Sequence, residues 1–211
     1  IKQNKVKRYL HISSLNADPK SIGEYLKSKG KAEDFLLSET SSFCNITIFR
    51  PSIVFGESDS FFNKFATLLK FLPIFPLACP NAKFMPVYVE DLTDFMISAI
   101  NTIDTYGQKI DVTGPNEYTF RELIDQTLIA LNTRRIIIPL NNFLSRLQAR
   151  VFEKLPGKLF TMDNYQSLQI DSCSDEGFRG SSSLEDIIPQ YLNIKTKQER
   201  FEKLRKKSGR K

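Results

Sequence analysis

Three successive stretches near the start of the chain constrain its fold more than any other feature. Residues 6–14 have a strand-like sequence, residues 23–40 carry a helical pattern without proline, and residues 45–56 are again β-rich. A helix between two such strands is typical of the crossover connection that joins parallel strands. The chain therefore predicts an α/β fold with a parallel sheet, in which ligands bind at the carboxyl ends of the strands.

The alternation continues along the chain. The Asp18–Pro19 step is a start signal for the first helix, Asp91 is expected to cap a later one, and Thr119 with Glu122 forms a capping-box pattern. Prolines make 73–80 an expected irregular segment. The second strand is expected to turn at Arg50–Pro51, and residues 162–178 fit no pattern. Further strands are predicted at 84–89, 109–113 and 134–140, and further helices at 61–72, 91–101, 119–131, 141–155 and 183–192, the last with a break or kink at Pro189.

Tyr25 and Lys29 are the first candidates for chemistry. Their four-residue spacing places a phenol and an ammonium on one face of the predicted helix. A free tyrosine has a pKa of about 10, and a nearby ammonium favours the phenolate, which suits a tyrosine to proton transfer at a carbonyl or alcohol oxygen. The spacing alone is weak evidence, because Tyr191 and Lys195 repeat it in a segment that leads into a basic tail. The alternative is an exposed pair in a lysine-rich helix.

The order of several motifs is more specific than this one pair. Ser14 ends the first predicted strand 11 residues before Tyr25, and a second strand follows the helix. This layout resembles the short-chain dehydrogenase/reductase superfamily, and within it the atypical, extended branch that contains a nucleotide-binding accessory subunit of respiratory complex I. The resemblance covers residues 6–192. The motifs that carry it are His11–Asp18, Tyr25–Lys29, Arg50–Gly56, Asp59–Phe65, Pro86–Leu92 and Gly114–Phe120.

The resemblance implies roles for individual residues. Tyr25 would be the general acid/base, Lys29 the ribose anchor, and Ser14 the partner of the substrate oxygen. Ser13 joins the cofactor-binding set, although hydrogen bonding at the strand end is its plainer interpretation. The remaining expected cofactor contacts are Pro51, Ser52, Ile53 and Val54. The expected borders of the substrate pocket, with core packing as the alternative, are Phe62, Met85 and Val87.

The implied cofactor is NAD or NADP, yet its phosphate site is missing from the sequence. A dinucleotide needs a strand, a glycine-rich loop and a helix N-terminus, and no G-x-x-G-x-x-G or G-x-G-x-x-G occurs. The resemblance places that loop before Ile1, so these residues alone are not expected to hold a dinucleotide tightly. The expected fold is the C-terminal part of a Rossmann-type doubly wound sheet plus a smaller substrate lobe. The Rossmann part is expected to comprise residues 1–56 and 91–113, and the interleaved substrate or partner lobe residues 57–90 and 114–193. Residues 194–211 are expected to form a basic tail.

The charge of the chain excludes one class of function. The formal net charge is +6, but residues 194–211 hold nine Lys or Arg against two Glu, so the body is close to neutral and nucleic-acid binding is not expected. The three cysteines lack C-x-x-C spacing, and with a single histidine no metal site is expected. No signal peptide is visible in these residues, and they contain no apolar run of about 18 residues. A cytoplasmic protein is therefore expected, and a peripheral position on the inner face of a membrane is the alternative.

Two features suggest partners. The amphipathic segment 142–155 and the basic tail fit a membrane surface or respiratory-complex subunits, although packing on the chain itself is the commoner outcome. The first functional hypothesis is an NAD(P)-binding, atypical short-chain reductase-like protein tied to quinone or respiratory metabolism. A non-catalytic assembly or stability factor of a respiratory membrane complex is the second. A nucleotide-sugar epimerase or dehydratase is the third.

Overall fold

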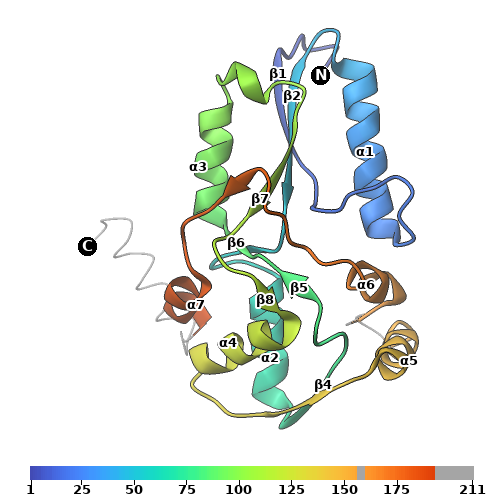
Figure 1. Cartoon of the computed structure of the whole chain (residues 1–211), viewed down its shortest axis with the longest axis vertical. Coiled ribbons are helices and arrows are strands. Elements are labelled where there is room, and N and C mark those ends of the chain that lie inside the picture. The colour runs from blue at the N-terminus through green and yellow to red at the C-terminus, as the bar shows by residue number, and fades with distance from the viewer. Residues whose placement is uncertain (156–159, 193–211) are drawn as a thin grey trace.

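A four-stranded parallel sheet forms one end of the molecule (Figure 1). In the computed structural model, which describes residues 1–155 and 160–192, its strand order is β1–β2–β7–β10 and all three pairings are parallel. The α/β class predicted from the sequence is confirmed. The strands are β1 (Arg8–Ile12), β2 (Asn45–Pro51), β7 (Lys109–Thr113) and β10 (Phe178–Arg179).

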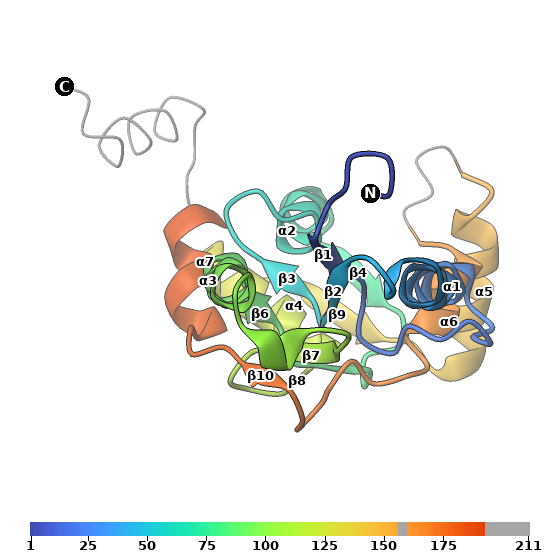
Figure 2. The same ribbon diagram turned by 90° about the horizontal axis from the view of Figure 1, so that it is seen from above.

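Helices cover both faces of this sheet. Figure 2 shows α1 (Glu24–Thr40) on one side of β1 and β2 and α3 (Val89–Ala99) on the other. Ile46 and Ile48 of β2 pack in the cluster beneath α1, whereas Phe49 belongs to the cluster beneath α3. Successive side chains of a strand point to opposite faces, so one β2 strand supplies both cores. This arrangement is the doubly wound packing that the motif order implies.

The other end of the molecule is built around a second core. Its fully buried members include Phe55, Phe62, Leu69, Leu123 and Ile124. Three short strand pairs contribute side chains to this core. They are β3 (Val54–Phe55) with β6 (Val87–Tyr88), β4 (Ile74–Leu77) with β9 (Ile136–Pro139), and β5 (Lys83–Phe84) with β8 (Tyr118–Thr119). The helices are α2 (Phe61–Phe71), α4 (Phe120–Ala130), α5 (Asn142–Phe152), α6 (Met162–Ser167) and α7 (Leu184–Leu192). A short 3-10 turn at Ile103–Thr105 belongs to the sheet end, where the Thr47 hydroxyl of β2 donates to the Thr105 carbonyl.

The prediction that residues 73–80 are irregular is wrong. Ile74–Leu77 form β4, which pairs in parallel register with β9. Pro76 is tolerated because β4 has a partner on one side only in the described part of the chain, and a proline can occupy an edge position where no ladder donor is required.

The helix predicted over residues 23–40 is confirmed as α1, which begins at Glu24. The Asp18–Pro19 step does not mark its start, because the Asp18 carbonyl accepts a backbone hydrogen bond from Ser21 in a turn before the helix. Two predicted strand boundaries are corrected. Val54–Phe55 is a separate strand, since β2 ends at Pro51. The predicted strand 84–89 is divided between β5 and β6.

Asp91 does not cap its own helix. α3 begins at Val89 with Tyr88 as the N-cap residue. The Asp91 carboxylate accepts hydrogen bonds from the backbone N–H groups of Ser181 and Ser182, both at 2.8 Å, and so fixes the segment that leads into α7. The predicted capping box of Thr119 and Glu122 is confirmed, and α7 continues through Pro189. The prediction for the tail at 194–211 lies outside the described residues.

Candidate functional site

A cavity of about 430 Å³ opens at the carboxyl ends of β1 and β2, beside α1 and α6. Parallel strands bring their carboxyl ends to one edge of a sheet, which explains why residues distant in sequence meet here. All the residues predicted for catalysis and cofactor binding line this cavity. They are Ser13, Ser14, Tyr25, Lys29, Pro51, Ser52, Ile53 and Val54.

Close packing of α1 positions the tyrosine and the lysine. A Cβ atom added at Gly30 would lie 2.3 Å from the backbone carbon of Asp18 and the nitrogen of Pro19, so only a glycine allows this approach. Lys29 donates from Nζ to the Ile12 carbonyl at 3.2 Å, at the end of β1. The first turn of α1 is held by Asp163 of α6, whose Oδ1 accepts from the Tyr25 backbone N–H at 3.1 Å. The Tyr25 side chain, 46% exposed, lines the cavity.

The two adjacent serines differ in their surroundings. Ser13 is buried, and its Oγ donates to Oε1 of Glu33 at 2.5 Å. Ser14 is half-buried, and its Oγ lies 3.3 Å from the carbonyl of Leu15, a long hydrogen bond. The Ser13 hydroxyl is thus committed to a buried carboxylate. Ser14 is the better placed of the two to exchange its hydrogen bond for one to a ligand.

A buried carboxylate lies beneath the cavity. Glu33 of α1 is fully buried and accepts from Arg50 Nε at 2.8 Å, while Lys109 Nζ of β7 lies 3.0 Å from its Oε2. Burial acts to raise the pKa of Glu33, but hydrogen bonds from Arg50, Ser13 and Lys109 outweigh it, and the pKa is lowered. Glu33 therefore stays ionised and joins the helix that carries Tyr25 and Lys29 to β2, to β7 and to the segment directly after β1.

Sequence reasoning missed Glu33 and Lys109. The aromatic residues of α1 do not mark its buried face, because Tyr25 and Phe35 are exposed. The buried face instead runs through Leu26, Gly30 and Glu33, spaced by four and three residues. A glutamate at a core-facing helical position was the available signal, because a carboxylate there requires a buried cation as a partner.

The residues predicted to border the substrate pocket occupy the core. Phe62 and Val87 are fully buried and Met85 is 5% exposed, and none of them lines the cavity. Their neighbours Phe61 and Phe84 reach it instead. Further wall residues that the sequence did not suggest come from α6 and the segment after it: Ser167, Leu168, Ile170 and Ser172.

The cavity suits one end of a dinucleotide. Tyr25, Lys29 and Ser14 bring a phenol, an ammonium and a hydroxyl to its lining, and residues 51–54 line it as well. This set fits the ribose and nicotinamide of NAD(P), with a proton donor or acceptor for a substrate oxygen beside them. Within the described residues, no strand followed by a glycine-rich loop and a helix N-terminus is available for the pyrophosphate.

Comparison with known proteins places the chain among relatives about twice its length. It is 30% identical over 198 residues to the mouse protein named "NADH dehydrogenase [ubiquinone] 1 alpha subcomplex subunit 9, mitochondrial", covering 92% of this chain and 51% of the relative. The chain spans about half the length of the curated relatives from mouse, rat and Arabidopsis thaliana that it matches.

Solved structures agree on the fold. The UDP-glucose 4-epimerase of Thermotoga maritima, solved with UDP-glucose, superposes with a TM-score of 0.61 at 12% identity, over 94% of this chain and 64% of that one. A dTDP-glucose 4,6-dehydratase of Streptomyces venezuelae, solved with NAD bound, gives 0.57 at 16% identity, over 88% and 58%. At these identities the likeness concerns the fold alone. The model of the 3-beta hydroxysteroid dehydrogenase/isomerase family matches residues 7–123, more than half of the chain.

Proposed function

Because the chain belongs to the 3-beta hydroxysteroid dehydrogenase/isomerase family, we propose that it is an NAD(P)-binding, atypical short-chain reductase-like protein of the respiratory complex I accessory-subunit type. The observation that carries this proposal is the cavity at the ends of β1 and β2. It gathers in one place every residue that the motifs assign to catalysis and to the cofactor. A random set of surface positions would not converge in this way on the strand ends where such folds bind ligands.

Each polar residue has a proposed task. Tyr25 holds or moves the proton at a substrate oxygen, and Ser14 donates a hydrogen bond to the same oxygen. Lys29 supplies a positive charge beside the phenol and donors for ribose hydroxyls, from a position already fixed by the Ile12 carbonyl. NAD(P), when bound, would supply the hydride chemistry. Glu33 is a positioning residue, since its hydrogen bonds hold α1 in place against the ends of β1 and β2.

The proposed setting is a respiratory complex. The mouse relative is named as a mitochondrial NADH dehydrogenase subunit, and the similarity extends over 92% of this chain. Respiratory-complex subunits are therefore the proposed partners. The proposed location is the surface of the membrane that holds them, which keeps the peripheral part of the expectation; the relatives' names point to mitochondria and not to the cytoplasm. No helix in the described part of the chain has both the length and the apolar character needed to span a bilayer.

Binding of NADPH and NADH to the purified full-length protein tests this proposal, because residues 1–211 by themselves lack the glycine-rich phosphate loop. Lys29→Met is expected to weaken the binding of the preferred nucleotide by roughly tenfold or more, as for the loss of a charged hydrogen bond. Lys27→Met is the matched control, because Lys27 pairs with Glu24 at 3.0 Å and does not line the cavity. Absence of nucleotide binding, or equal losses in the two variants, would contradict the proposal.

A non-catalytic assembly or stability factor is the second candidate, favoured by the relatives that are themselves subunits of a respiratory enzyme. Tyr25→Phe separates the two candidates, because it removes the proton-transfer hydroxyl and leaves the ring. Loss of turnover with nucleotide binding retained favours the reductase. Full complementation of a deletion strain by Tyr25→Phe favours the assembly factor.

A nucleotide-sugar epimerase or dehydratase is the third candidate and predicts that a nucleoside-diphosphate sugar binds together with NAD.

A further inference from the structure

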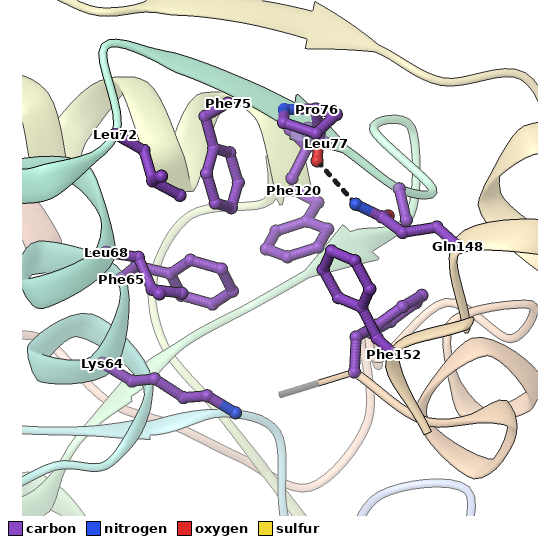
Figure 3. Close-up of a pocket in the computed structure, with 12 residues that line it drawn as sticks. Lys64, Phe65, Leu68, Leu72, Phe75, Pro76, Leu77, Phe120, Gln148 and Phe152 are labelled. Carbon is purple, nitrogen blue, oxygen red and sulfur yellow. Dashed lines mark hydrogen bonds between the residues drawn. The ribbon is translucent and has the colours of Figure 1, made fainter. Parts of the chain in front are cut away.

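A second pocket, of a different character, lies between α2, β4 and α5, where Phe65 in its wall contacts Phe61 of the first cavity with the ring centroids 4.9 Å apart. Its volume is about 160 Å³. Figure 3 shows the rings of Phe65, Phe75, Phe120 and Phe152 around a common space, with Lys64 and Gln148 at its edges. Gln148 is held by its Nε2 donating to the Pro76 carbonyl at 3.1 Å. The remaining lining residues are Leu68, Leu72, Pro76, Leu77, Ala78 and Phe160.

The size of this pocket limits what it can hold. A water molecule occupies about 30 Å³ in the liquid, and a methylene group is of similar bulk, so the pocket accommodates about five methylene-sized units. Its apolar lining offers little to a polar ligand of that size. An unbranched hydrocarbon end fits both the volume and the lining, and any longer chain must continue over the surface outside.

The surface beside the pocket is apolar as well. Helix α5 contributes Gln148 and Phe152 to the lining, and its outer face exposes large apolar side chains. Phe143 is 74% exposed, and Leu144, Leu147 and Val151 are each at least 42% exposed. An amphipathic helix that leaves this face uncovered is suited to the boundary between lipid headgroups and acyl chains.

The nearby charges favour an anionic partner. Lys64 is the single charged residue among the described residues that line the pocket. Arg146 and Arg150 are exposed on α5, and that helix contains no Asp or Glu. Basic side chains beside an apolar helical face attract anionic lipid headgroups.

We propose that the α2–β4–α5 pocket receives the end of one acyl chain of an anionic membrane phospholipid while α5 lies in the membrane interface. The proposal does not depend on nucleotide binding. It makes this end of the molecule a lipid-binding site with a defined cavity, rather than a helix that merely adheres to a charged surface.

The absence of tryptophan from the chain allows a direct test. Phe152→Trp places a single fluorescent reporter in the pocket wall, and Phe143→Trp places one on the outer face of α5. Ile97→Trp, on α3 at the far end of the molecule, is the control. Each variant is mixed with phosphatidylcholine/phosphatidylglycerol vesicles whose acyl chains carry bromine, a short-range quencher. The expected result is strong quenching of the Phe152→Trp and Phe143→Trp variants and none of the Ile97→Trp variant.

Two results would overturn the proposal. Quenching of the Phe143→Trp variant without that of Phe152→Trp would mean surface adsorption with no chain in the pocket. Quenching of Phe152→Trp by a free brominated fatty acid, with no binding to vesicles, would make the ligand a soluble fatty acid instead of a membrane lipid.

The charge requirement has its own matched pair on α2. Lys64→Gln is expected to lower the affinity for phosphatidylglycerol-containing vesicles about fivefold, the effect of one basic residue near an anionic surface. Lys70, also on α2, does not line the pocket, and Lys70→Gln is expected to lower the affinity by less than twofold. Equal losses would indicate diffuse surface charge and would contradict a role for the pocket.

Discussion

The two cavities of this molecule are built in opposite ways. The cavity at the ends of β1 and β2 places serine hydroxyls and the Lys29 ammonium among apolar side chains at the strand termini, and the elements around it are joined by a buried ionised glutamate. The α2–β4–α5 pocket is walled by aromatic rings and leucines. The first depends on charges that must be partnered in the interior, and the second on shape and apolar area. The following variants test whether these dependences are separate, in order of expected effect.

The largest effect is expected from Arg50→Leu. This change leaves the fully buried Glu33 with Lys109 as its remaining cation, and removal of one partner from a buried ion pair costs about 3–5 kcal/mol. We expect the free energy of unfolding, measured with urea, to fall by about 3 kcal/mol, near the lower end of this range. The affinity of the cavity at the ends of β1 and β2 for nucleotide should fall as well.

The matched control is Arg121→Leu. Arg121 pairs with Asp125 on the surface, where both side chains are about 40% exposed, and such pairs contribute less than about 1 kcal/mol. Similar losses in Arg50→Leu and Arg121→Leu would show that the Glu33 cluster is not a special support of the cavity.

An intermediate effect is expected from Gly30→Ala. In an exposed helix this change is stabilising by about 1 kcal/mol. Here the added methyl group meets the backbone of Asp18 and Pro19, so we expect a loss of about 1–3 kcal/mol in the free energy of unfolding. Nucleotide binding should fall too, since α1 carries Tyr25 and Lys29.

The control for this position is Ser28→Ala, an exposed site on the same helix, where a change within about 0.5 kcal/mol is expected. A stabilising Gly30→Ala would mean that α1 does not pack against the loop after β1 in solution.

The smallest effect is expected from Asn141→Ala. The Asn141 side chain caps α5 by accepting from the Leu144 N–H at 2.9 Å, and loss of such a cap costs about 1 kcal/mol. Residues of α5 line the apolar pocket and none of them lines the cavity at the ends of β1 and β2. The midpoint temperature of thermal unfolding should therefore fall slightly, while the affinity for nucleotide stays constant. Asn101→Ala, at an exposed position after α3, is the comparison. A loss of nucleotide affinity in Asn141→Ala would show that the two cavities are coupled.

Much of the architecture was accessible from local signals. The crossover unit of β1, α1 and β2 follows from patterns within single segments, and the Thr119 capping box follows from a four-residue motif. The strand formed by Ile74–Leu77 was not accessible. Its partner Ile136–Pro139 lies about 60 residues away, and the pairing overrides the local signal of the prolines.

The candidate site shows the same division. The order of Ser14, Tyr25, Lys29 and the Arg50–Gly56 motif was sufficient to choose the residues around the polar cavity. The motif order was not sufficient to choose between adjacent residues, because Phe61 and Phe84 reach the cavity while Phe62 and Met85 lie in the core. One position along a helix or strand rotates a side chain to another face, and only packing reveals which face meets the cavity.

The sequence by itself determined the parallel α/β class and the residues that line the cavity at the strand ends, because helical and strand periodicities and motif order are local properties of the chain. Tertiary structure decided the partnering of Glu33 by Ser13, Arg50 and Lys109, the pairing of β4 with β9, and the pocket between α2, β4 and α5. Each of these depends on segments far apart in sequence, whose contacts form only when the chain packs.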